Sequence, residues 1–130
     1  MSLVVDASVV VAALIQDSAS GHWAEQVMAD QHLFAPALMP AEVANVLRRL
    51  EAAGLLDVTA AGIAFADLQR LAWDEVPFAP CAARIWELRR NLTAYDAWYV
   101  AAAEGLGLPL ASLDTRLANA AGPTCRIVTP

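Results

Sequence analysis

The chain has 130 residues, of which 58% are hydrophobic, and its formal net charge is −6. This length suits one domain with a single core, and the acidic charge argues against a broad basic surface for nucleic acid. No apolar run reaches the ~18 residues that a membrane span needs, so we expect no membrane segment. The apolar excess reflects either tight packing of an alanine-rich core or a surface kept for another chain.

The first half of the sequence alternates short apolar strands with helical patterns. Val43, Val46 and Leu47 recur at helical spacing ahead of Gly54, which is typical of a helix that ends at a glycine. In chain order we expect a strand over Leu3–Val5, helices over Ser8–Ile15 and Ser20–Asp30, a strand over His32–Ala35, and helices over Pro40–Ala53 and Thr59–Ala72.

The second half continues this alternation. We expect a strand over Val76–Phe78, helices over Cys81–Leu92 and Ala94–Glu104, a strand over Leu110–Ser112, a helix over Asp114–Ala121 and a strand over Arg126–Val128. Strands that alternate with helices indicate an α/β fold with a parallel sheet and helices on both faces. No repeat, linker or low-complexity tract divides the sequence, so we expect residues 1–130 to form one domain.

The cysteines and the N-terminus bear on the compartment. Cys81 and Cys125 are far apart and form no C-x-x-C pair, and no Lys or Arg precedes the first apolar run. The N-terminus therefore does not resemble a signal peptide. Together these features predict a reduced cytoplasmic protein with two buried thiols.

Four acidic residues stand where a strand should end or a helix should begin. They are Asp6, Glu42, Asp96 and Asp114. In a parallel sheet these positions share one edge, where ligands usually bind. Carboxylates gathered there repel one another unless a hard cation such as Mg²⁺ neutralises them. The pattern therefore indicates metal-dependent phosphate chemistry.

Helix capping is the competing explanation for the same four acids. Asp6, Asp96 and Asp114 suit the caps or first turns of helices, and Glu42 lies in the first turn of its helix, where the macrodipole favours negative charge. Capping accounts for each acid alone but predicts no convergence among them, whereas a cation site requires it.

Polar residues near these acids suggest further roles. Asn45 and Arg49 lie three and seven residues after Glu42 on one helix face, where they would orient its carboxylate and touch a phosphate. The alternative for Arg49 is a solvated surface side chain, and Arg48 either pairs with Glu51 or stays on the surface. Arg89 and Arg116 are further candidates for contact with nucleic acid.

Other residues with chemical potential match no catalytic pattern. His22 and His32 have no acid or nucleophile motif around them. Arg84, Glu87 and Arg90 repeat at three-residue intervals, which predicts an ion ladder on the surface. The four tryptophans are expected to pack the core or an interface, with base stacking as the lesser alternative. No phosphate-binding glycine motif is present.

Taken in order, four segments of the sequence resemble the PIN domain, and more narrowly the VapC-type toxins of bacterial toxin–antitoxin pairs. These segments are Val4–Ser8, Pro40–Leu47, Thr93–Ala97 and Ala111–Leu117. The resemblance covers nearly the whole chain. It implies a three-layer α/β/α sandwich with a central, mainly parallel sheet, and RNA cleavage that depends on Mg²⁺ or Mn²⁺.

The resemblance also assigns roles to individual residues. It implies that the four acids, Asp6, Glu42, Asp96 and Asp114, bind the metal and act in catalysis, and that Ser8 and Asn45 support them. Arg116 stands where some members carry a further acid, so it is expected to meet the substrate phosphate instead. The expected reaction is hydrolysis of RNA by water that the metal activates. Two alternatives stay open: a PIN-like binding module without catalysis, and a metal-dependent DNase or phosphohydrolase.

Partners follow from the apolar excess and from the resemblance. We expect a homodimer and a cognate antitoxin whose segment lies over the helices near the acidic pocket and presents an Arg or Lys to its carboxylates. The helices over Ser8–Ile15 and Ser20–Asp30 are the expected pairing surface.

Overall fold

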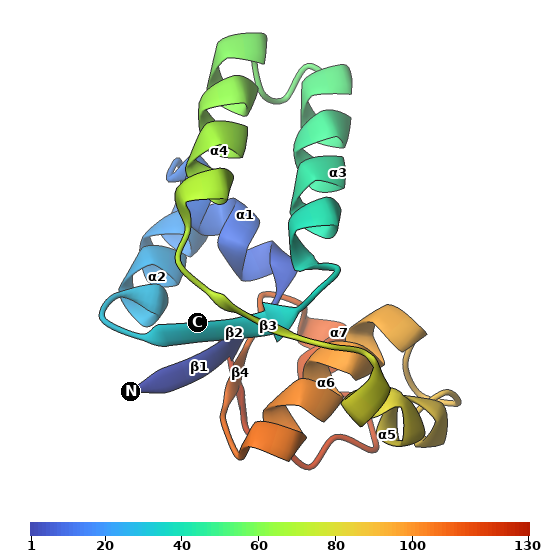
Figure 1. Cartoon of the computed structure of the whole chain (residues 1–130). Coiled ribbons are helices and arrows are strands. Elements are labelled where there is room, and N and C mark those ends of the chain that lie inside the picture. The colour runs from blue at the N-terminus through green and yellow to red at the C-terminus, as the bar shows by residue number, and fades with distance from the viewer.

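Five parallel strands form a single sheet at the centre of the computed structural model, which describes residues 1–130 (Figure 1). The strands are β1 (Ser2–Val5), β2 (His32–Pro36), β3 (Asp74–Val76), β4 (Leu110–Ala111) and β5 (Ile127–Val128). Their order across the sheet is β3-β2-β1-β4-β5. In register, Val4 pairs with Phe34 of β2, and Val5 pairs with Ala111 of β4.

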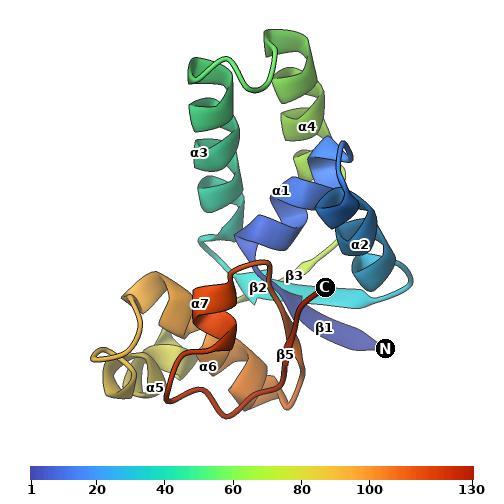
Figure 2. The same cartoon turned by 180° about the vertical axis from the view of Figure 1, so that it is seen from behind.

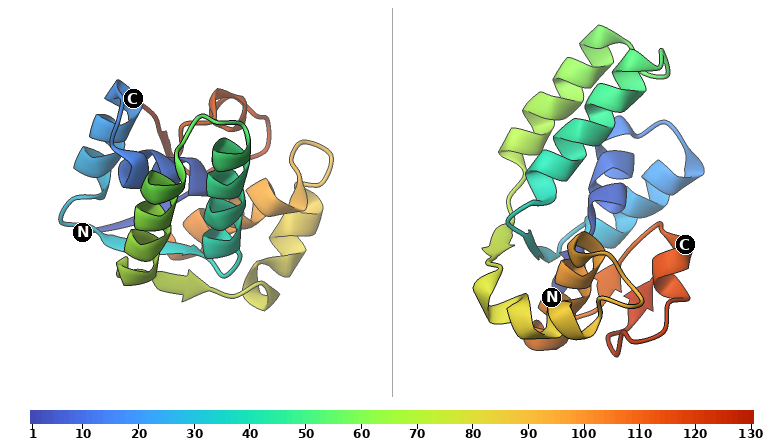
Figure 3. Two further views of the ribbon diagram at one scale, coloured as in Figure 1. Left: turned by 90° about the horizontal axis from the view of Figure 1, so that it is seen from above. Right: turned by 90° about the vertical axis from the view of Figure 1, so that its right-hand side faces the viewer.

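Helices lie on both sides of this sheet. They are α1 (Ala7–Ile15), α2 (Ala19–Met28), α3 (Met39–Ala52), α4 (Val58–Arg70), α5 (Ala82–Glu87), α6 (Ala94–Leu106) and α7 (Thr115–Ala118). Helices α1 to α4 lie on one side, and α6 packs on the other with α5 beside it (Figures 1 and 2). The expected three-layer sandwich is therefore confirmed. Helices α3 and α4 form a hairpin that projects from the sheet (Figure 3).

The layers are held together by a buried apolar core. Val4 and Val5 of β1 are fully buried, as are Val9 and Val10 of α1. Because helices cover both faces of the sheet, β1 reads as a continuous apolar run rather than an alternating one. On the opposite side, the small residues 101–103 of α6 are buried and allow a close approach to the strands. No helix of the chain combines the length and apolar character that a membrane crossing requires.

The order of strands creates a switch point beside β1. From β1 the chain builds outward through β2 to β3, then returns to the other side of β1 for β4 and β5. In open parallel sheets the crevice for ligands lies at such a reversal, beyond the carboxyl ends of the strands. Asp6 follows β1 and Ser112 follows β4, so both flank this crevice.

Several sequence-based boundaries were wrong, for local reasons. The third strand spans Asp74–Val76 instead of Val76–Phe78, because its pairing with β2 ends at Val76. The expected helix over Cys81–Leu92 is a 3₁₀ turn over Ala79–Cys81 followed by the shorter α5. Leu88 caps the end of α5 and is buried in the core, with 2% of its surface exposed. The expected helix over Asp114–Ala121 shortens to α7, with Asp114 as its cap.

One expectation about burial was also wrong. Cys81 is buried as expected, but Cys125 is only half-buried. Trp23, Trp73 and Trp98 pack against the core as expected, and for Trp86, which is 68% exposed, a place in an interface stays a prediction.

Candidate active site

Asp6 lies at the carboxyl end of β1 and is 7% exposed. Its Oδ1 accepts hydrogen bonds from the Ser8 hydroxyl and, at 3.1 Å, from the main-chain N–H of Val9, which caps α1. Burial raises the pKa of Asp6, hydrogen bonds from Ser112, Ser8 and Val9 oppose that rise, and the nearby charge of Asp96 adds to it. A neighbouring cation would therefore stabilise the charged form of Asp6.

Serines join the ends of β1 and β4 around Asp6. The Ser8 hydroxyl accepts a 3.1 Å hydrogen bond from the main-chain N–H of Leu113. Ser112 is fully buried, and its hydroxyl accepts a 2.9 Å bond from the main-chain N–H of Asp114. Ser112 was not among the expected site residues. Its place directly after the β4 strand, next to an acid two residues on, was the available signal.

Glu42 lies in the first turn of α3 and is half-buried. The hydroxyl of Tyr99 on α6 donates a 2.7 Å hydrogen bond to its Oε1. Burial raises the pKa of Glu42, the Tyr99 bond lowers it, and the charges of Asp96 and Asp6 raise it. Sequence reasoning missed Tyr99. Its spacing of three residues from Asp96 on one helix was the only hint.

Asp96 and Asp114 face a shared cavity of about 250 Å³. Arg116, Asn91 and Thr93 line the same cavity. Burial raises the pKa of Asp96, the charge of Asp114 raises it further, and Thr93 and Arg116 lower it. Asp114 Oδ1 caps α7 by accepting from the main-chain N–H of Arg116 at 2.9 Å, and the Arg116 side chain lies 3.6 Å from the same oxygen.

Electrostatic coupling links the four acids at this edge of the sheet. Asp96 raises the pKa values of both Asp6 and Glu42, and Asp114 raises that of Asp96. Asp96 is therefore the common neighbour of the other three. No three of these carboxylates form a ready-made metal cage. Glu42 lines a separate cavity with Asn45.

The donor set suits a hard divalent cation. All four side chains offer oxygen, which Mg²⁺ and Mn²⁺ prefer. Mg²⁺ is commonly held by one or two carboxylates, with water and substrate phosphate completing its shell, so a cage of three acids is unnecessary. Capping does not compete with this role, because the capping bonds of Asp6 and Asp114 use only Oδ1. The residues present therefore fit such an ion.

The remaining expected site residues are distributed unevenly. Asn45 is near Glu42, but its Oδ1 accepts a 3.0 Å bond from Arg48. Arg48 thus pairs with Asn45 instead of Glu51, which corrects that expectation. Arg49 is exposed and lines neither of the two cavities that hold Glu42, Asp96 and Asp114. Arg116 lies at the rim of the cavity with its side chain 92% exposed.

Comparison with known proteins places the chain in a family. The PIN domain family model matches residues 3–123. Ribonuclease VapC9 of Mycobacterium tuberculosis is 40% identical over 125 residues, covering 96% of this chain and 95% of the relative. Ribonuclease VapC1 of the same species is 38% identical over 125 residues, covering 95% and 94%.

Solved structures share the fold. PAE2754 of Pyrobaculum aerophilum aligns with a TM-score of 0.73 at 24% identity and covers 98% of this chain and 83% of that one. VapBC2 of Rickettsia felis, solved bound to a DNA fragment from its promoter, aligns with a TM-score of 0.68 at 12% identity, covering 99% and 98%. From the family match, the sequence identity and the fold together, the chain belongs to the PIN domain family and, within it, to the VapC-type toxins.

Proposed function

We propose that this chain is the toxin of a toxin–antitoxin pair and an endoribonuclease that hydrolyses RNA phosphodiester bonds with Mg²⁺ or Mn²⁺. The observation that carries the proposal is the placement of carboxylates from distant parts of the chain beside the switch point of the sheet: Asp6 directly follows β1, and Asp96 and Asp114 line one cavity. Identity of 40% to a protein named as a ribonuclease supports the same substrate class.

In this proposal Asp6 and Asp96 are the principal ligands, with Asp114 and Glu42 in support. When bound, the ion lowers the pKa of water and stabilises negative charge on the scissile phosphate. Ser8 and the main-chain N–H of Val9 hold the Asp6 carboxylate in one orientation. Tyr99 does the same for Glu42.

Arg116 supplies the positive charge at the rim of the cavity. Its side chain lies 3.6 Å from Asp114 Oδ1 and is 92% exposed, so it can also contact a phosphate that approaches Asp96 and Asp114. An RNA strand is repelled by the acids themselves, so a cation at the rim favours its approach. Asn45 adds a polar group beside Glu42, whereas Arg49 is assigned no contact with the reacting phosphate.

The partners in this proposal are a cognate antitoxin and a second copy of the chain. The proposed antitoxin partner is supported by a groove of about 300 Å³ lined by α1 and α2. Val10, Leu14 and Met28 of α1 and α2 line it, so it presents apolar surface from both helices expected to pair. Leu55, Val58, Ile63 and Phe65 leave further apolar surface exposed on the α3–α4 hairpin.

A cleavage assay tests the activity. We expect the parent chain to cut single-stranded RNA with Mg²⁺ or Mn²⁺ and to be inactive in EDTA. Asp96→Asn should lower the rate by about a hundredfold or more, because it removes a charged ligand. The control is Asp30→Asn, an exposed acid at φ 58°, a backbone conformation that Asn also adopts. Cleavage of DNA or a phosphomonoester in preference to RNA would instead support a different hydrolase.

A further inference from the structure

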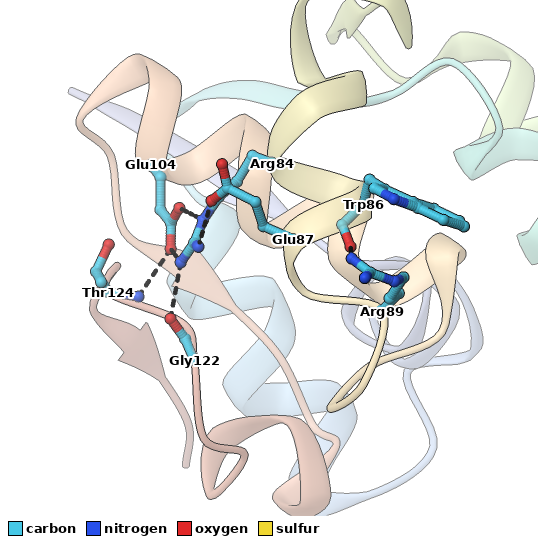
Figure 4. A network of polar contacts seen from close by, with 7 residues as sticks. All are labelled: Arg84, Trp86, Glu87, Arg89, Glu104, Gly122 and Thr124. Carbon is cyan, nitrogen blue, oxygen red and sulfur yellow. Dashed lines mark hydrogen bonds and ion pairs between the residues drawn. The ribbon is translucent and has the colours of Figure 1, made fainter.

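Trp86 on α5 is a large aromatic side chain left in solvent. It is 68% exposed, and the guanidinium of Arg89 lies 4.6 Å from the centroid of its ring (Figure 4). Arg89 also donates a 2.8 Å hydrogen bond to the main-chain carbonyl of Trp86. This bond caps the end of α5 and explains the position of Arg89. It does not explain why the indole is outside the core, where burial would stabilise the fold.

The helix that carries Trp86 is fixed in place by a polar network. Arg84 Nε donates to Glu104 of α6 at 2.6 Å, and its Nη2 donates to the Gly122 carbonyl at 2.8 Å. Glu104 also accepts a 2.7 Å bond from the main-chain N–H of Thr124 (Figure 4). The surface ladder expected from sequence is confirmed for Arg84 and Glu87, which lie 3.2 Å apart, but Arg90 forms no ion pair. The closest acidic partner of Arg84, Glu104, is on another helix. The exposed ring thus stands on a rigid support.

The chain leads from this ring directly to the acidic cavity. Asn91 and Thr93, which follow α5, line the same cavity as Asp96 and Asp114. The stretch from Trp86 to Thr93 spans at most about 25 Å even when fully extended, and here it is folded into turns. A strand bound at the cavity therefore reaches the ring within a few nucleotides.

Positive charge gathers along this path in an otherwise acidic chain. Arg89 and Arg90 are exposed, and neither forms an ion pair. Arg116 stands at the opposite rim of the cavity. With a net charge of −6 over the whole molecule, these arginines mark the surface that complements a polyanion.

We infer that Trp86, with Arg89 and Arg90, forms a stacking platform for single-stranded RNA that holds the substrate beside the acidic cavity. A base stacks on the face of the exposed indole that Arg89 does not cover, and the arginines contact neighbouring phosphates. Charge favours RNA over a protein partner, because an apolar protein surface would gain little from two arginines that have no acidic partner. The inference rests on the proposed ribonuclease function and names how its substrate is held.

Binding in EDTA tests the platform separately from catalysis. The probe is a fluorescein-labelled, unstructured oligoribonucleotide of about 12 nucleotides, followed by anisotropy. Trp86→Ala should raise the Kd about tenfold, whereas Trp86→Phe, which keeps a ring, should stay within about threefold. Arg90→Ala should weaken binding and flatten the plot of log K against log salt by about 0.7. Phe65→Ala, an exposed aromatic on α4, is the matched control and should bind like the parent.

Outcomes separate the two proposals. Equal binding by the parent and Trp86→Ala overturns the platform. So does a Trp86→Ala variant that binds RNA normally but loses self-association or antitoxin binding, because the ring then belongs to a protein interface. Weaker binding by Trp86→Ala with no cleavage by the parent in Mg²⁺ or Mn²⁺ supports the platform and refutes the ribonuclease. In a cleaving parent, the substitution should raise KM about tenfold and leave kcat within about twofold.

Discussion

Tyr99 on α6 donates a 2.7 Å hydrogen bond to Glu42 on α3, across 57 residues of sequence. Tyr99 is 2% exposed, so its hydroxyl is shielded from solvent at the junction of two layers. Burial and the bond to Glu42 raise the pKa of Tyr99, which keeps the hydroxyl protonated and able to donate. The bond sets the direction of a carboxylate assigned to metal binding.

Tyr99→Phe should therefore weaken the binding of Mn²⁺. We expect isothermal titration calorimetry to show a loss of affinity of about tenfold or more, and unfolding in urea to show a cost of only about 1 kcal/mol. Tyr95→Phe is the control, because Tyr95 is 59% exposed and its hydroxyl has no hydrogen-bond partner. If Tyr99→Phe bound Mn²⁺ as tightly as the parent does, Glu42 in the orientation set by Tyr99 would not be a metal ligand.

Two substitutions of Asp6 separate its capping role from its proposed metal role. Asp6→Asn keeps a side-chain oxygen that accepts from the N–H of Val9, whereas Asp6→Ala removes the cap. RNA cleavage should be lost in both. Only Asp6→Ala should lose stability, by about 1 kcal/mol, because Asn caps helices as well as Asp does.

The direction of the stability change in Asp6→Asn follows from its pKa. Burial raises the pKa of Asp6, so the folded state disfavours the charged form, and removing the charge should leave stability unchanged or raised. Urea denaturation at neutral pH measures this. Full cleavage by Asp6→Asn would leave Asp6 as a helix cap only.

Local sequence patterns were sufficient to predict the part of the candidate site that lies at the ends of strands. Asp6 follows an apolar run that had to be buried on both faces, so its place at the carboxyl edge of β1 was predictable. The same reasoning applies to Asp114 after β4. The capping interpretation was correct for Asp6 and Asp114, since each uses one oxygen as a cap, and their metal-binding role stays a prediction.

What the sequence could not reveal depends on contacts between distant segments. The bond from Tyr99 to Glu42 joins two helices, and nothing in either helix alone requires it. The bond from Arg84 to Glu104 likewise joins two helices, whereas the pair of Arg84 with Glu87 on one helix was predictable. Trp86 is a residue type usually found in cores, and only the packing of α5 in the folded chain shows that its ring is 68% exposed.

The network around Glu104 should give the chain an acid-sensitive component of stability. Burial alone would raise the pKa of Glu104, but hydrogen bonds from Arg84 and Thr124 lower it below its usual 4.5. A carboxyl with a lowered pKa in the folded state stabilises the protein above its unfolded pKa, and that contribution is lost as pH falls through the folded value.

Glu104→Gln measures this component. At neutral pH it should cost about 1–3 kcal/mol, because Arg84 loses its charged partner. The difference from the parent should shrink as the pH is lowered below about 4.5, where the parent carboxyl also becomes protonated. Glu51→Gln is the control, since that exposed side chain has no partner. A difference that stays constant from pH 7 to acid would exclude a titrating contribution from Glu104.

Two glycines that lie inside helices should respond to alanine with opposite signs. A Cβ at Gly21 of α2 would lie 2.9 Å from the main-chain carbonyl oxygen of Ala12 in α1, so the two helices must separate. We expect Gly21→Ala to lower the free energy of unfolding by about 1–3 kcal/mol, as overpacking does. Gly62 of α4 has nothing within 4 Å of the same position. There, alanine should stabilise the chain by about 0.5–1 kcal/mol, because it favours the helix.

Because α1 and α2 are the expected antitoxin surface, Gly21→Ala should also weaken the complex with the antitoxin, whereas Gly62→Ala should not. Equal stability of the two variants in urea would show that α1 and α2 are not packed as closely as the structure has them.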